Sequence, residues 1–74
     1  MLNIKYAMVT DTLTLEGKSY IAYGILVLSN NTPVRYIPDV FLDKNYAVKY
    51  ISLFNDLRLS PIHLNDVIDD IVGL

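Results

Sequence analysis

Cysteine is absent from this chain, and glycine is scarce, with one residue each at positions 17, 24 and 73. Without cysteine the protein has no thiol nucleophile, no disulfide framework and no zinc site of the usual cysteine type. The scattered glycines form no phosphate-binding loop. These absences exclude several common enzyme and scaffold classes.

Charge is also scarce, at 19% of residues against a typical value of about 25%. The net charge is −2, and no basic stripe of the kind that displaces counterions from phosphate is present, so nucleic acid is an unlikely partner. No apolar run approaches the roughly 20 residues of a spanning helix, and the N-terminus lacks the pattern of a signal peptide. We therefore expect a cytoplasmic protein that does not enter the membrane.

Apolar residues, in contrast, are abundant. They make up 53% of only 74 residues, which we expect to form a single domain over residues 1–74. A chain this short buries roughly 60–65% of the surface that its unfolded form exposes, so one small core does not hide all of its apolar area. The composition therefore favours association, with a protein partner or with itself as a homodimer.

The first forty residues read as strands. Residues 20–28 are rich in β-branched and aromatic side chains, and turn sequences flank them at Gly17-Lys18 and Asn30-Asn31. Residues 4–15 and 33–40 then pair with this central strand as an antiparallel meander. The polar stretch at residues 10–12 suggests a bend or bulge in the first strand.

The second half has helical periodicity. Asp43 is placed to cap a helix from Lys44 to about Leu57. The apolar stripe of this helix consists of Ala47, Tyr50, Ile51, Phe54 and Leu57. Val48 and Leu53 make it wider than a simple surface helix needs.

The last helix is expected over residues 61–72. Ser60, whose side-chain oxygen is expected to cap the helix, and Pro61 form a start signal, and Gly73 is a stop signal. The apolar stripe consists of Leu64, Val67, Ile68 and Ile71. The predicted fold class is α+β, a three-stranded antiparallel β-meander followed by a two-helix hairpin packed on one sheet face, in the order β-β-β-α-α.

Turns at Gly17-Lys18 and Asn30-Asn31 would sort the strand residues onto two faces. The aliphatic face, with small residues where a helix can approach, is assigned to the core: Ala7, Val9, Leu13, Leu15, Ala22, Gly24, Leu26, Leu28, Ile37 and Phe41. The opposite face is rich in tyrosine and threonine: Ile4, Tyr6, Met8, Thr10, Thr12, Thr14, Ile21, Tyr23, Ile25, Val27, Val34 and Tyr36.

This Tyr/Thr-rich face has three interpretations. It is an ordinary solvated sheet face, a homodimer or partner surface, or a platform on which nucleic-acid bases stack. Self-association is the leading hypothesis, and a nucleic-acid-binding domain that uses the tyrosines is the alternative. The interaction residues predicted on this face are Tyr6, Met8, Tyr23, Ile25 and Tyr36.

His63, Asp66 and Asp70 share one side of the last helix and form a second candidate contact. A solvated polar face explains them better than a metal or proton-transfer site, because no ligands from another element are apparent. Asp69 and Asp70 lie near the helix C-terminus, where the macrodipole disfavours negative charge. We expect no catalytic, cofactor or metal site, and a small interaction or regulatory module without enzymatic activity.

The segments Tyr23-Gly24-Ile25 and Ser60-Pro61-Ile62-His63-Leu64, followed by Asp66-Val67-Ile68 and Asp70, carry a resemblance. Over about residues 20–72 the chain resembles a family of short Gram-positive bacterial proteins of unknown function, which end in a Ser-Pro-x-His-Leu-x-Asp-Val helix motif. The resemblance implies a strand-rich first half, two helices and a bacterial cytoplasmic setting. It implies no activity, substrate or cofactor.

Overall fold

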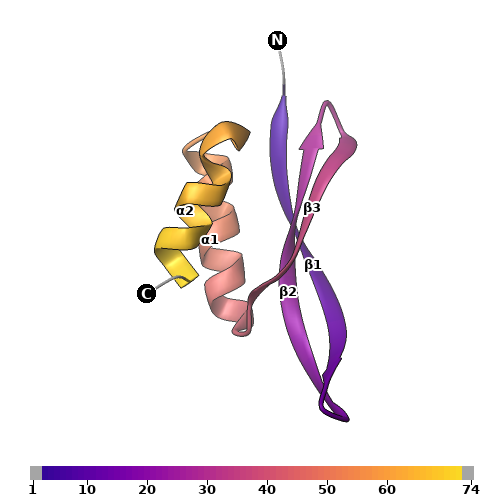
Figure 1. Cartoon of the computed structure of the whole chain (residues 1–74). Coiled ribbons are helices and arrows are strands. Elements are labelled where there is room, and N and C mark those ends of the chain that lie inside the picture. The colour runs from indigo at the N-terminus through magenta and orange to yellow at the C-terminus, as the bar shows by residue number, and fades with distance from the viewer. Residues whose placement is uncertain (1–2, 73–74) are drawn as a thin grey trace.

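The computed structural model describes residues 3–72 and has the predicted order of elements. Strands β1 (Ile4–Leu15), β2 (Lys18–Ser29) and β3 (Thr32–Phe41) form one antiparallel sheet in the order β1-β2-β3. Helix α1 (Lys44–Asp56), the short 3-10 turn η1 (Pro61–His63) and helix α2 (Leu64–Val72) follow. Both helices lie on one side of the sheet, and the β1–β2 hairpin extends beyond them (Figure 1). The predicted α+β class is confirmed.

The two hairpin turns differ in how well they were predicted. The second turn is confirmed at Asn30 and Asn31, whose φ angles are 50° and 67°. The first turn was predicted one residue too late, because Glu16 (φ 53°) and Gly17 (φ 77°) are its central residues and Leu15 pairs with Lys18. Positive φ at both central residues is typical of a type I′ turn, whose twist matches that of the flanking strands.

Irregular pairing occurs in β3 and not in β1. The pairing of β1 with β2 is unbroken from Ile4 to Leu15, so the bulge that was one of the two predictions for residues 10–12 is wrong. In β3, Pro33 pairs with Leu28, but Arg35 pairs with Val27, which leaves Val34 as an extra residue. A one-residue bulge reverses the sides to which all later side chains point. It therefore moves Ile37 and Phe41 to one side of the sheet and Tyr36 to the other.

The assignment of the sheet faces was wrong for β1 and β2, but Phe41 of β3 belongs to the core as predicted. Tyr6 is only 4% exposed and Ile25 is fully buried, and both belong to the core with residues of α1 and α2. Met8 and Tyr23 pack at the edge of the same cluster, so the tyrosine-bearing face lies under the helices. The buried core residues are Tyr6, Ile25, Val27, Phe41, Ala47, Ile51, Phe54, Leu64 and Ile68.

Tyr6 joins the sheet to the helices through three hydrogen bonds. Its backbone N–H donates to Asn55 Oδ1 at 2.8 Å, and Asn55 Nδ2 donates to the Tyr6 carbonyl at 2.9 Å. The Asn55 amide therefore occupies the free edge of β1 as another strand would. The Tyr6 hydroxyl donates to the Leu59 carbonyl, after the end of α1, at 2.6 Å. A buried tyrosine needs such a partner, and here it has one.

The small residues of β2 do not face a helix, contrary to the prediction. They were predicted to admit a helix, but Gly24 lies under the ring of Tyr36 and close to the backbone of β3. The Tyr36 hydroxyl reaches across β2 to donate to the Asp11 carboxylate of β1. A side chain of β3 thus crosses the sheet on the face away from the helices, above the one residue in this part of β2 that has no Cβ.

Of the capping interactions predicted at the helix starts, one is confirmed and one is wrong. Asp43 caps α1, because its carboxylate accepts from the N–H groups of Asn45 and Tyr46 at 2.7 Å and 3.3 Å. Ser60 precedes Pro61 with the extended backbone of a capping residue, but its side chain makes no capping hydrogen bond, so that part of the prediction is wrong. The predicted stop at Gly73 lies outside the described residues.

Replacing Tyr6 by phenylalanine tests the sheet–helix connection. Tyr6→Phe leaves the Leu59 carbonyl without its donor, so we expect the free energy of unfolding to fall by about 1 kcal/mol at neutral pH. Tyr46→Phe is the control, because the structure gives the Tyr46 hydroxyl no partner among the described residues. Urea denaturation followed by circular dichroism measures both, and equal losses would contradict the role of Tyr6.

The same variant has a predicted pH dependence. Burial raises the pKa of Tyr6 above its usual value of 10.0. Folding therefore favours the neutral hydroxyl, whose stabilising contribution is fully present below about pH 10 and is lost as the pH rises through the raised pKa. Tyr6→Phe should lose less stability than Tyr46→Phe on going from neutral pH to about pH 11. A loss as large as in the control would show that Tyr6 is not the group involved.

Gly24→Ala tests the packing of β2 against β3. A Cβ at this position would lie 2.6 Å from the Ile37 carbonyl oxygen and 2.9 Å from the Tyr36 ring. We expect a loss of about 1–3 kcal/mol, typical of overpacking. Because the nearest atom belongs to the backbone, adding Tyr36→Ala should not restore stability. Thermal unfolding of the single and double variants decides this, and full recovery in the double variant would contradict it.

Candidate functional site

An apolar groove runs between the two helices. One end is a hollow of about 550 Å³ between the end of β3, the start of α1 and the end of α2. A second hollow of about 310 Å³ adjoins it, since Tyr50 and Ile71 line both. We call the two together the α1–α2 groove, which is lined by Val40, Phe41, Leu42, Asp43, Tyr46, Tyr50, Leu53, Phe54, Leu57, Leu59, Val67, Asp70, Ile71 and Val72.

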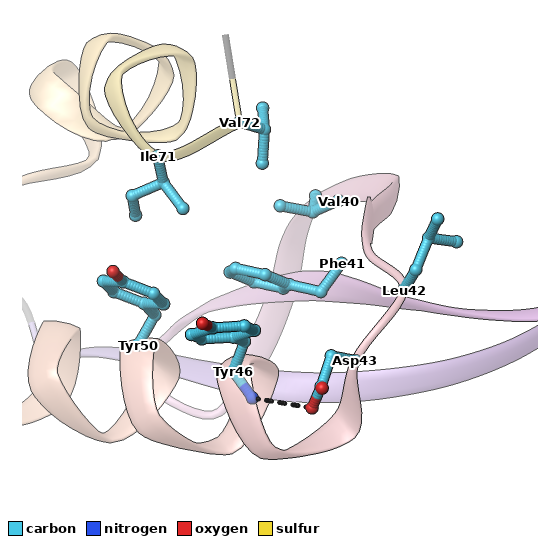
Figure 2. A pocket seen from close by; sticks show the side chains of 8 residues that line it. All are labelled: Val40, Phe41, Leu42, Asp43, Tyr46, Tyr50, Ile71 and Val72. Carbon is cyan, nitrogen blue, oxygen red and sulfur yellow. Dashed lines mark hydrogen bonds between the residues drawn. The ribbon is translucent and has the colours of Figure 1, made fainter. Parts of the chain in front are cut away.

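Aromatic rings form one wall of this groove. The rings of Phe41 and Tyr50 are stacked at 5.9 Å with an interplanar angle of 5°, and Tyr46 and Tyr50 stack at 6.3 Å and 25°. Figure 2 shows Ile71 and Val72 of α2 facing these rings across the hollow. Asp43 also lines it, but its carboxylate caps α1. The wall therefore offers apolar contact and two tyrosine hydroxyls.

The α1 side of the groove remains open to solvent. Tyr46, Leu53 and Leu57 are 56%, 42% and 70% exposed. With the half-buried Tyr50 they recur at steps of four, three and four residues, which places them in one stripe along α1. This stripe is separate from the buried stripe of Ala47, Ile51 and Phe54. Helix α1 thus has two apolar stripes, of which only one is covered.

Charges of opposite sign border the two walls. Lys49 of α1 extends its Nζ over the Tyr50 ring, 5.6 Å from the ring centre, which is within the range of a cation–π contact. Asp70 of α2 lines the groove on the other side, and Asp66 is exposed one turn earlier on the same helix. The α1 side therefore carries Lys49 and, at its start, the capping carboxylate of Asp43, whereas the α2 border is acidic.

The predicted interaction surface on the sheet is not assembled. Tyr6 and Ile25 are buried under the helices, and Met8 and Tyr23 are half-buried at the edge of the core. Tyr36, at 41% exposure, is on the opposite side of the sheet. The five residues therefore do not share a free face. A base-stacking platform would need the same tyrosines to be accessible together, so this geometry does not provide it.

The outer sheet face has a tyrosine–carboxylate contact at each of two places. Tyr36 donates to Asp11, and the Tyr20 hydroxyl donates to Asp39 Oδ2 at 3.3 Å. Partial desolvation raises the pKa of Tyr20, and the charge of Asp39 and its hydrogen bond raise it further. Asp39 has a positive φ of 56° in the irregular part of β3. These contacts fix the path of β3 across the sheet.

The predicted cluster on the last helix is divided by the structure. His63 belongs to the 3-10 turn η1, while Asp66 and Asp70 belong to α2. All three side chains are exposed, and only Asp70 lines the groove. Within residues 3–72 no group of histidine or acidic side chains is arranged to hold a metal ion. Arg35 donates to Asn65 Oδ1 at 2.7 Å rather than to an acidic residue of α2.

A larger and more polar hollow of about 810 Å³ lies at the edge of β1, around the contact of Tyr6 with Asn55. Lys5 and Arg58 contribute its cationic side chains. Arg58 has a left-handed φ of 52°, and the N–H groups of Arg58 and Leu59 donate to the carbonyls of Asn55 and Phe54. This is the Schellman arrangement that ends a helix, with arginine where glycine is usual. The hollow thus surrounds the end of α1.

Sequence reasoning missed the groove residues Leu42, Tyr46, Leu53, Leu57 and Ile71 as a surface. A signal was present, since the stripe of α1 was wider than a surface helix needs. The four-three-four spacing from Tyr46 to Leu57 was the specific indication. The residues Tyr50, Leu53 and Leu57 were instead assigned to one core-facing stripe of the helix. The sequence does not show how far the second helix covers the first.

No helix of residues 3–72 has the length and apolar character needed to cross a bilayer. Comparison with curated proteins and with solved structures found no match. The sequence model of a family of unknown function, DUF6514, matches residues 1–74. Because this match covers the whole chain, the protein belongs to the DUF6514 family.

Proposed function

We propose that the protein is a small, non-enzymatic interaction module that associates with a second copy of itself. The single observation that carries this proposal is the amount of large apolar side chain left exposed. Among the described residues, exposed large hydrophobic side chains are as numerous as buried hydrophobic residues. Five of these exposed side chains line the α1–α2 groove, namely Leu42, Tyr46, Leu53, Leu57 and Val72. Monomeric domains seldom leave a large contiguous apolar patch uncovered.

The overall dimensions support association. The accessible surface is 5350 Å², whereas a compact monomer of 8.4 kDa exposes about 4,600 Å². The radius of gyration is 12.7 Å, against about 11 Å for a compact domain of this length. The surplus is roughly 750 Å², part of which is the surface of the β1–β2 hairpin that extends beyond the helices (Figure 1). A partner in a stable interface contributes an area of similar size, about 800 Å².

The surface that would make this contact differs from the one first expected. The Tyr/Thr-rich face is covered by the helices over its tyrosine-bearing half, so it does not supply the interface. Two apolar surfaces remain, the α1–α2 groove and the outer sheet face with Tyr36. A non-enzymatic role is favoured because the groove brings together mainly aromatic and aliphatic side chains, and its lining carboxylates are Asp43, which caps α1, and Asp70. Such a surface suits binding better than proton transfer.

The mass of the purified chain in solution tests this proposal. Sedimentation equilibrium over a range from low to high micromolar concentration should give a mass of twice 8.4 kDa at the upper end, with dissociation on dilution. Moderate salt should leave most of the association intact, because apolar contact rather than charge is the main contribution. A single-chain mass throughout this range would contradict self-association.

A further inference from the structure

We infer that the second copy seats on the α1–α2 groove, so that the two-helix layers of two chains pack against each other about a two-fold axis. This inference rests on the proposed function, since it names the surface through which the chains associate. It also selects between the two apolar surfaces that the fold leaves uncovered.

The shape of the exposed stripe favours a helix as the occupant. Tyr46, Tyr50, Leu53 and Leu57 follow the four-three-four spacing of a helix-packing seam. Such a seam receives side chains from a second helix lying nearly parallel or antiparallel to it. A helix with an exposed apolar seam is present in each copy of this chain, so each chain offers both the groove and a helix to place beside it.

The charges at the borders favour a second copy over an unrelated helix. In the two-fold arrangement that we propose, helix α1 of each chain lies in the groove of the other and therefore faces its helix α2. Lys49, which borders the groove on α1, would then approach the acidic border of the second copy at Asp70, and the reverse contact would form by symmetry. The groove is therefore complementary in charge to its own copy, which one interface uses twice.

The same arrangement explains an unfavourable feature of α2. Asp66 and Asp70 are a like-charge pair four residues apart, and Asp70 lies near the negative end of the helix dipole. Both effects oppose helix formation in an isolated chain. A lysine from a second copy beside Asp70 offsets both effects. The carboxylate that destabilises α2 in the monomer would then form a favourable charge contact in the dimer.

The outer sheet face is the weaker candidate. Its strand residues Ala7, Val9, Leu26 and Leu28 are half-buried, and Tyr36 already lies across Gly24 to contact Asp11. That side chain covers part of the surface that a second sheet would need. On the α1 side of the groove Lys49 extends over the Tyr50 ring, but Tyr46, Leu53 and Leu57 stay exposed.

The first test compares two matched substitutions in the full chain. Leu53→Glu places a carboxylate in the groove, and Ile62→Glu places one at an exposed apolar residue that does not line the groove. Sedimentation equilibrium should show that Leu53→Glu raises the dissociation constant by about tenfold or more, whereas Ile62→Glu leaves it near that of the unaltered chain. Circular dichroism of each variant confirms that it is folded.

The second test does not require an apolar substitution. Lys49→Asp and Asp70→Lys should each raise the dissociation constant by about tenfold, because each places like charges opposite one another. The double variant should recover most of the lost association, because it restores opposite charges in the reversed order. This charge-exchange test decides the question even if the Leu53→Glu variant fails to fold.

The outcomes separate the two proposals. If the unaltered chain dimerises but Leu53→Glu does so equally well, and the charge exchange has no effect, the groove is the wrong surface and self-association stands. If the unaltered chain is monomeric at high micromolar concentration, both proposals fail and the groove is left to a different protein. Loss with Leu53→Glu and recovery with the charge exchange support the inference.

Discussion

The structure depends on how one tyrosine is buried. Tyr6 lies on the outermost strand, yet its backbone is paired with the Asn55 amide and its hydroxyl with the Leu59 carbonyl. Its ring packs edge-on against Phe54, with centres 5.8 Å apart. One residue therefore connects the edge of the sheet to the last turn of α1 and to the loop that follows it. Because these polar groups are satisfied, the large apolar ring can be buried without an unmet hydrogen-bonding group.

This docking decides which surfaces remain open. The helices cover one side of the sheet around Ile25 and Val27. On the other side, Tyr36 covers only the part around Gly24. Helix α2 is short and covers only part of α1, so the second apolar stripe of α1 faces solvent beside α2. In a chain with so little charge, this exposed apolar stripe is the surface that we propose for a partner. The same scarcity of charge makes the position of Lys49 opposite an acidic border informative.

Much of the fold could be predicted, because turns, caps and periodicity are local signals. The three strands, the Asn30-Asn31 turn and the Asp43 cap were all identified from neighbouring residues. The face that meets the helices was not, because it depends on contacts far apart in the chain. Small residues at Ala22 and Gly24 suggested a helix above them, whereas Gly24 accommodates Tyr36. The bulge at Val34 reverses the sides in β3. The candidate groove was missed for the same reason, since its openness depends on where α2 ends.

Hydrogen exchange at the edge of β1 tests the central claim, that Asn55 pairs with Tyr6 and holds the helices on this strand. The N–H groups of Tyr6, Thr10 and Thr12 all point away from β2, because alternate residues of an antiparallel strand face its free edge. Only that of Tyr6 is accepted by Asn55. The Tyr6 amide should therefore exchange much more slowly than those of Thr10 and Thr12, and Asn55→Ala should remove this protection. Exchange of the Tyr6 amide as fast as that of Thr12 in the unaltered chain would contradict the account.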